Sequence, residues 1–290
     1  MSGSAPQPVD PGTGGGPQGG TPPRPRRGWW WLLFALLALA LVTALVSQPW
    51  EPVVTEPAPS TTVTVPSPTT PSTPSPSVSI GPPGADAVFD PTTAAPLFVT
   101  PEELATDVPA AEPGVQPLIT SGQRTWGLPA GSTVDPAECL TAVTVVATPP
   151  SWFDTRLWGN SAMSFEQEVI LLPDPAAARE AFRELVTTVD ACPKYSQVNE
   201  GIDGATWTAE PAIEGQGVFP SIVQEITHSA EAATLPAYRG HMLVGNAIVT
   251  WTAESLASMD PDAALATLGD PETLSAMVQG RAQSAVQALG

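Results

Sequence analysis

Apolar residues recur at spacings of three and four after Asp174, which predicts a helix over residues 175–192. Asp174 can accept hydrogen bonds from the free amides of the first turn, Pro175 fits that turn, and Pro193 ends the helix. The expected buried face consists of Ala178, Phe182, Leu185, Val189 and Cys192. Similar start signals predict helices from 100–104, 260–261 and 270–272, the last with an apolar stripe of Leu274, Met277, Val278 and Ala285.

Strands are predicted where β-branched and aromatic residues gather, over 141–148, 165–172, 221–228, 238–243 and 247–252. Gly245-Asn246 between the last two is a two-residue hairpin signal, because both residues tolerate positive φ. The resulting register opposes Leu243 to Ile248, Met242 to Val249, and Gly240 to Trp251, whose indole should cover the glycine. We therefore expect an α+β fold with a mainly antiparallel sheet and flanking helices.

A different pattern precedes this domain: nineteen uncharged, mostly apolar residues, Trp29 to Ser47. As a helix they would extend roughly 28 Å, which is close to the hydrocarbon thickness of a bilayer. Arg24, Arg26 and Arg27 precede the segment, so the positive-inside rule places the N-terminus in the cytoplasm and the remainder outside. A cleaved signal peptide is the main alternative, but its apolar core is normally shorter and ends at a small-x-small site. No cysteine follows for a lipid anchor.

Composition divides the chain into four parts. Residues 1–28 are rich in Gly and Pro and should form a disordered cytoplasmic tail, followed by the transmembrane helix over 29–48. Residues 49–85 form a Pro/Thr/Ser-rich linker, which favours extended polyproline II and holds the next domain away from the membrane. Residues 86–290 are long enough for one folded extracellular domain.

Charge narrows the range of partners. Residues 51–290 carry 28 acidic side chains against seven basic ones, so no general electrostatic field attracts nucleic acid or an anionic lipid surface. Solubility is the simplest consequence, and attraction of a basic partner is the alternative.

Cys139 and Cys192 are the only cysteines, and an oxidising compartment favours a disulfide between them. It would connect the end of the 175–192 helix to the start of the 141–148 strand. A reactive thiol pair or a metal site is the alternative, although neither a CxxC motif nor a nearby histidine supports it.

Few other residues indicate chemistry. His228 and His241 are scattered over two predicted strands, where a structural or solvated role is more common than a metal site. Glu166 and Glu168 share one face of a strand and could act as an acid–base pair, but a solvated strand face is the favoured explanation. No nucleophile elbow, HExxH or nucleotide-binding glycine pattern is present, and we expect neither a bound metal nor a cofactor.

An aromatic segment is the candidate ligand site. Trp152, Phe153, Arg156 and Trp158 lie between Pro149-Pro150 and Gly159-Asn160, which predicts a loop that can line a cleft. The alternative is that these side chains cover the edge of the core.

Several stretches together resemble the PknH-like extracellular sensor domain family of actinobacteria. The first stretch is residues 97–104, at the start of the domain. Next come Cys139 with the strand predicted after it, residues 169–174, and the helix that ends in Cys192. The last stretch is the 245–249 hairpin, which precedes a closing helix. Over residues 95–289 the resemblance implies an α+β domain with a broad cleft, carried on a membrane anchor, that binds an extracellular ligand. The family commonly has four cysteines where this chain has two, and residues 1–28 do not contain a kinase domain.

We therefore predict a non-catalytic, membrane-anchored extracytoplasmic sensor or ligand-binding protein, with an unknown extracellular ligand or protein partner. The alternatives are a surface-displayed hydrolase of cell-envelope polymers and a spacer or adhesion module without a small ligand.

Overall fold

The computed structural model describes residues 82–199, 202–230, 233–257 and 260–290. The helices are η1 (Ala95–Leu97), α2 (Pro101–Asp107), η2 (Pro109–Ala111), η3 (Ala137–Cys139), α3 (Leu140–Thr144), α4 (Pro175–Ala191), α5 (Pro261–Ala266) and α6 (Pro271–Leu289). The strands are β1 (Gln116–Ile119), β2 (Ser132–Asp135), β3 (Trp152–Gly159), β4 (Met163–Leu171), β5 (Lys194–Asn199), β6 (Ile202–Ala209), β7 (Ile213–Glu214), β8 (Ser221–Ala230), β9 (Ala233–Val244) and β10 (Ala247–Ser255).

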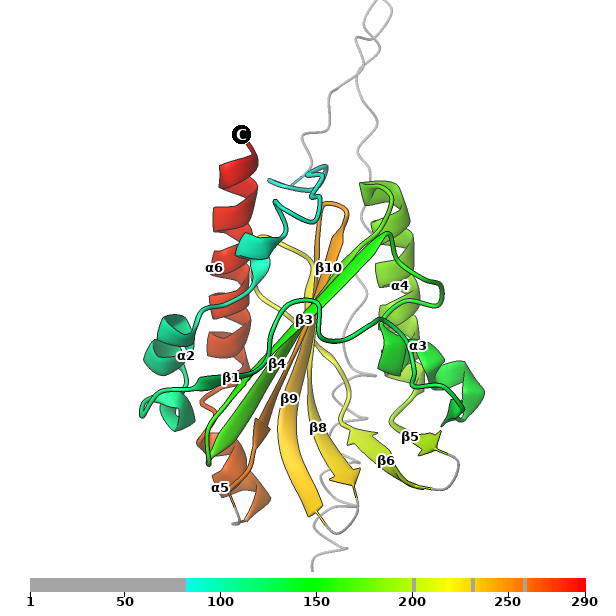
Figure 1. Ribbon diagram of the computed structural model, residues 1–290, viewed down its shortest axis with the longest axis vertical. Helices are drawn as coiled ribbons and strands as arrows, with labels where there is room; N and C mark the ends of the chain where they lie inside the picture. The colour runs from blue at the N-terminus through cyan, green and yellow to red at the C-terminus, as the bar shows by residue number, and fades with distance from the viewer. Residues whose placement is uncertain (1–81, 200–201, 231–232, 258–259) are drawn as a thin grey trace, which may run out of the picture. The chain divides into compact units, whose positions relative to one another are not determined.

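The strands form one sheet in the order β1-β3-β4-β10-β9-β8-β6-β5-β2, with β7 paired to β8. Every strand pair in the described residues is antiparallel. Figure 1 shows the strands passing between α6 on one side and α4 on the other. The expected α+β fold with a mainly antiparallel sheet is confirmed.

The predicted β9–β10 hairpin has the expected register. Leu243 pairs with Ile248, and Gly240 pairs with Trp251. A Cβ atom at Gly240 would overlap the indole of Trp251, so this glycine is required by close packing. Gly245 adopts a φ of 56° in the turn, as the hairpin signal requires.

The predicted helices are confirmed, together with their start signals. The side chains of Asp174, Asp260 and Asp270 each accept a hydrogen bond from the first turn of α4, α5 and α6. Thr100 and Glu103 form a reciprocal capping box at the start of α2.

Two assignments from the sequence are wrong. The β-branched run 141–148 is not a strand, because its first residues form α3, and Thr141, Ala142 and Val145 are buried at helical spacing. The Thr144 hydroxyl donates to the carbonyls of Leu140 and Val146, which supplies a local alternative to strand pairing. The aromatic segment 152–158 is not a loop but strand β3, paired with β4 over its whole length.

One face of the sheet carries the main apolar core. The segment 87–115, α5 and α6 pack on this face, which we call the closed face. At its centre the rings of Trp158, Phe165 and Trp251 follow one another across β3, β4 and β10, with centroids 6.3 and 6.1 Å apart.

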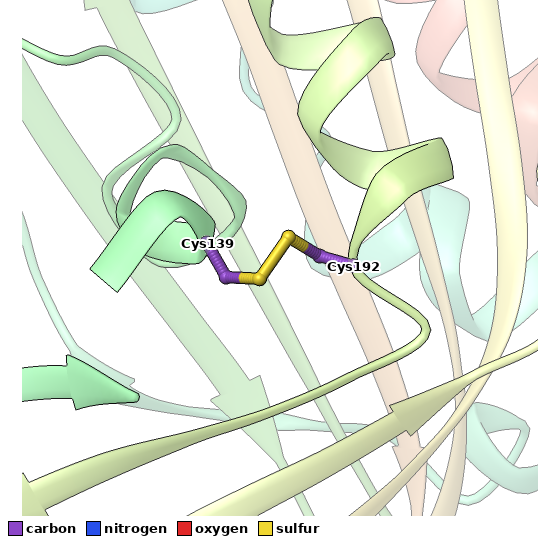
Figure 2. Close-up of a disulfide and its surroundings, with 2 residues drawn as sticks. All are labelled: Cys139 and Cys192. Carbon is purple, nitrogen blue, oxygen red and sulfur yellow. A yellow bond between two sulfur atoms is a disulfide. The ribbon is translucent and has the colours of Figure 1, made fainter. Parts of the chain in front are cut away.

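The opposite face, which we call the cavity face, is covered by α3 and α4. Phe182, Leu185 and Val189 of α4 pack on Ile170 and Ile248 of the sheet. The disulfide between Cys139 and Cys192 joins the residue before α3 to the residue after α4, as Figure 2 shows. The predicted disulfide is therefore present, but it connects two helices instead of a helix and a strand.

Within the described ranges, none of the helices is long and apolar enough to cross a membrane. The predicted tail, transmembrane helix 29–48 and most of the 49–85 linker lie outside these ranges.

Candidate functional site

A cavity of about 620 Å³ lies on the cavity face of the sheet, next to α3. Its floor comes from β3, β4, β5, β6, β9 and β10, and its other walls from α3 and from residues 123–129. The polar lining includes Arg124, Glu166, Glu168, Gln197, Arg239, His241, Thr250 and Thr252. The apolar lining includes Trp126, Leu128, Pro129, Ala142, Val143, Val145, Phe153 and Trp207.

Strand register places the polar floor residues in two parallel rows. In the first row, Glu168 of β4 and His241 of β9 both pair with Thr250 of β10. In the second row, Glu166 and Arg239 both pair with Thr252 in the same way. Each row therefore has a carboxyl group on β4, a hydroxyl group on β10 and a nitrogen-containing side chain on β9, neutral in His241 and positively charged in Arg239.

His241 is the most deeply buried polar residue of the floor, with 1% of its surface exposed. Its Nδ1 shares a hydrogen bond of 2.9 Å with the Thr250 hydroxyl. Its Nε2 is buried and has no hydrogen-bond partner in the described residues. Burial, and then the positive charge of Arg239, lowers the pKa of His241 to about 3, so the ring is neutral at ordinary pH.

Glu168 is partly buried in the floor and forms neither an ion pair nor a hydrogen bond with the part of the chain that the structure describes. Burial, and then the neighbouring Glu166 carboxylate, raises the pKa of Glu168 to about 7. Arg239 and Arg124 act in the opposite direction and lower it. Near neutral pH this carboxyl group is therefore present in both protonation states.

The polar side chains of the second row have partners within the protein. Arg124 forms an ion pair with Glu166, and both residues line the cavity. Arg239 donates from Nε to the Thr252 hydroxyl at 3.2 Å and from Nη1 to the Tyr195 hydroxyl at 2.9 Å. In the first row, by contrast, the Glu168 carboxyl group and His241 Nε2 have no hydrogen-bond partner in the described residues.

Residues 120–131, which we call the strap, run along the cavity and are held at several points. Asp154 accepts hydrogen bonds from the Ser121 hydroxyl at 2.7 Å and from the Gly122 amide at 2.9 Å. Further along, the indole Nε1 of Trp126 donates to the Thr144 carbonyl of α3 at 3.0 Å. These bonds fix the apolar side chains of the strap beside the polar floor.

The four residues of the aromatic segment do not gather at one cleft, because alternate residues of β3 point to opposite faces. Phe153 lines the cavity. Trp158 is 5% exposed within the core of the closed face, and Trp152 packs against the same core. Arg156 lies over the ring of Phe98, with its Cζ 4.1 Å from the ring centroid.

The remaining candidates are separated in space. His228 lies outside the cavity lining and shares a hydrogen bond of 2.8 Å with Glu254, while its ring stacks on Trp207. In the described part of the chain, no group of three or more His, Cys, Asp or Glu side chains could hold a metal ion. Glu166 and Glu168 share a face as predicted, but that face is a cavity floor and not a solvated surface.

Sequence reasoning did not identify Arg239, Thr250 and Thr252 as site residues. A usable signal was present in the predicted hairpin register. Pairing Gly240 with Trp251 also pairs Arg239 with Thr252 and His241 with Thr250, which gives a polar surface across two strands.

The chain matches no protein-family model and no curated protein. Among solved structures, it is similar to the extracellular domain of PknH from Mycobacterium tuberculosis, with 14% identity and a TM-score of 0.49 over 69% of this chain and 99% of that chain. It is also similar to an uncharacterized protein from Mycobacterium smegmatis, an Rv0999 ortholog, with 16% identity and a TM-score of 0.31 over 57% of this chain and 86% of that chain. Neither likeness is close enough to transfer a function.

Proposed function

We propose that residues 82–290 form a non-catalytic ligand-binding domain that takes a small molecule into the cavity beside the strap. The observation that supports this role is a cavity of about 620 Å³ with apolar walls, whose floor keeps the Glu168 carboxyl group without a partner among the described residues. Small-molecule sites have this volume, and they combine apolar walls with a few convergent polar groups.

Hydrolysis is the second candidate, because Glu168 titrates near neutral pH beside Glu166. A raised pKa suits a general acid. However, both carboxyl groups project side by side from one strand, and Glu166 is paired with Arg124. Glycoside hydrolysis needs two carboxyl groups on opposite sides of the bond to be cleaved, and this arrangement does not supply them. Binding without catalysis therefore fits better.

We also propose that the domain is displayed outside the cell on the 29–48 segment, as the sequence predicts. The support is the arginine cluster before that segment and the disulfide, which is typical of an oxidising compartment. Protease added to intact cells whose outer layers are permeable to it should remove the domain. Protection of the domain under these conditions would contradict the orientation.

Mass spectrometry of small molecules retained by the purified full chain tests the binding role. Val143→Trp should fill the cavity, because Val143 is a partly exposed lining residue of α3, and the variant should lose the retained molecule. Val198→Trp is the matched control, because Val198 is exposed on β5 and does not line the cavity. Retention of no molecule by the unsubstituted chain, or equal retention by both variants, would contradict the proposal.

A further inference from the structure

The strap forms one wall of the cavity and is held by few contacts. Residues 123–129 line the cavity, yet within the strap only Trp126 and Leu128 are partly buried, and all its other residues are exposed. Two hydrogen bonds connect this wall to distant parts of the described chain, from Arg124 to Glu166 of β4 and from Trp126 Nε1 to the Thr144 carbonyl. Segments with few buried contacts and few hydrogen bonds open at a low cost in free energy.

The two ends of this wall have the features of hinges. Asp154 binds the Ser121 hydroxyl and the Gly122 amide, which fixes the chain just before the wall. Gly122 and Gly131 adopt φ values of 76° and 82°, and a Cβ atom at either position would meet nothing within 4 Å. Backbone conformation and not close packing therefore requires these glycines, and glycine passes between positive and negative φ more readily than other residues. The segment 123–130 between them can rotate while Asp154 holds its N-terminal end.

Opening of the strap changes the surroundings of Glu168 on the cavity floor. Burial is the largest cause of the raised pKa of Glu168, the Glu166 carboxylate is the second, and the positive charge of Arg124 has the smallest effect, in the opposite direction. Moving the strap away returns water to the floor and removes Arg124. Because burial acts more strongly than Arg124, opening lowers the pKa of Glu168. The ionised carboxylate therefore favours the open strap, and the protonated group favours the closed one.

The other charged groups around Glu168 are few. Glu166 lies beside it on β4 and is paired with Arg124 of the strap. On β9, Arg239 is positively charged, and His241 is neutral because its pKa is lowered to about 3. The cavity-lining residues of α3, β3, β5, β6 and β10 have no titratable side chain; they are Ala142, Val143, Thr144, Phe153, Gln197, Trp207, Thr250 and Thr252. Near neutral pH, protons therefore act on this cavity through Glu168.

We propose that the strap is a pH-dependent gate of the cavity, which closes over protonated Glu168 and opens when Glu168 ionises. This proposal rests on the proposed binding function, because the gate controls access of a small molecule to that site. The closed state binds the proton of Glu168 more tightly than the open state, so closure is favoured at low pH and is progressively lost as pH rises.

Exchange of the Trp126 indole hydrogen with water tests the gate without any ligand. Its bond to the Thr144 carbonyl protects this hydrogen while the strap is closed. NMR on the full chain gives its exchange rate, which is divided by the rate for N-acetyltryptophanamide at the same pH, and Trp126→Phe assigns the resonance. From about pH 5.5 to about pH 8 we expect the normalised rate to rise roughly tenfold or more, since each unit by which opening lowers the pKa is worth up to a factor of ten. A constant or falling rate overturns the gate.

Substitution of Glu168 identifies the group that controls the gate. Glu168→Gln keeps the shape of the side chain but cannot ionise, so the normalised Trp126 rate should stay low and change less than about threefold over the same pH range. His228 and Glu166 remain in this variant and are thereby separated from Glu168. Glu184→Gln, which removes one exposed charge on α4 outside the cavity, is the control and should keep the full rise. A full rise in Glu168→Gln overturns the role of Glu168.

Trp158 supplies a reference within the same sample, so the test does not depend on a variant that folds. Its indole lies in the core of the closed face and should be exposed only when the whole domain unfolds. We expect its normalised exchange rate to stay well below that of Trp126 at both pH values. Equal rates at the two indoles would mean that the domain opens as a whole, and they would overturn the gate.

The gate and the binding function can fail separately. A constant Trp126 rate in a chain that retains a molecule which Val143→Trp excludes would overturn the gate and leave the binding function intact. A Trp126 rate that rises with pH as expected, in a chain that retains no molecule, would support the movement of the strap and overturn the binding function.

Discussion

The two faces of the same sheet treat buried polar side chains in opposite ways. On the closed face, Gln167 of β4 is fully buried and both ends of its amide are bonded, since Oε1 accepts from the Val99 amide and Nε2 donates to the Leu97 carbonyl. On the cavity face, His241 is equally buried, but only Nδ1 is bonded, to Thr250. A fold that satisfies one buried group completely and leaves another unsatisfied does not need the second arrangement for its own stability. The cost of an unsatisfied buried nitrogen therefore falls on the cavity face, the face for which we propose ligand binding.

The largest expected effect comes from emptying the closed face. Trp158→Ala should lower the free energy of unfolding by about 3–5 kcal/mol, because the ring is 5% exposed and lies in the central aromatic row. The folded fraction of this variant should bind the ligand with unchanged affinity. Phe153→Leu on the other face of β3 should cost less than about 1.5 kcal/mol but weaken retention of the ligand. Urea unfolding and ligand retention should be measured on both variants. If Trp158→Ala loses the ligand and Phe153→Leu keeps it, the assignment of binding to the cavity face is wrong.

The cavity face depends instead on a covalent connection between its two helices. Replacing both Cys139 and Cys192 by Ser should lower the free energy of unfolding by about 2–5 kcal/mol, since the bond closes a loop with a sequence separation of 53. The measurement is urea unfolding of the double variant against the oxidised protein. Titration of two free thiols in the unreduced native protein would refute the underlying bond.

The cavity face also contains two buried groups, Glu168 and His241, whose protonation changes the stability of the fold in opposite directions as pH rises. The pKa of Glu168 is raised from 4.5 to about 7 in the fold, so its contribution to stability is present at low pH and is lost as pH rises through that interval. The pKa of His241 is lowered from 6.5 to about 3, so its contribution is present at high pH and is lost as pH falls through that interval. Between about pH 4.5 and 6.5 the two effects oppose each other.

Single substitutions should therefore reveal slopes of opposite sign. Relative to the unsubstituted protein, Glu168→Gln should gain about 2 kcal/mol of stability as pH rises from 4.5 to 6.5, and His241→Asn should lose a similar amount. Glu166, Arg124 and Arg239 also face Glu168 and remain in both variants. Urea unfolding across this pH range checks the prediction. If stability changes with pH in the same way in both variants, the pKa values of Glu168 and His241 are not shifted in opposite directions, and the prediction is wrong.

The sequence predicted local features well, but it did not predict which face of the sheet carries the cavity and which carries the main core. Capping aspartates, the α4 stripe and the β9–β10 register depend on residues close in the chain, and they were confirmed. The assignment of 141–148 as a strand failed, because the β-branched preference was overcome by burial of Thr141 and Val145 in a short helix. The cavity was not predicted, because it brings together Arg124, Glu168 and Arg239 from segments far apart in the sequence. The aromatic segment was misplaced, since the side of the sheet on which Trp158 lies depends on pairing with β4.

The smallest effect on stability should come from the ion pair between the strap and the cavity floor. The side chains of Arg124 and Glu166 are 49% and 31% exposed, so Arg124→Gln should change the free energy of unfolding by less than about 1 kcal/mol. Its effect on the cavity should be larger, because the strap loses one attachment to β4. Removing the positive charge should also raise the pKa of Glu168 further. We therefore expect faster ligand release and faster hydrogen exchange at strap amides.

Arg183→Gln is the control, because Arg183 forms a more exposed ion pair with Glu180 on α4, and neither residue lines the cavity. Both variants should unfold at nearly the same urea concentration as the unsubstituted protein, since exposed pairs contribute little. Only Arg124→Gln should alter ligand release, strap exchange and the titration of Glu168 followed by carbon-detected NMR. Equal exchange rates in the two variants would show that the strap is held by its Asp154 and Trp126 bonds alone, and that the Arg124 pair does not control access to the cavity.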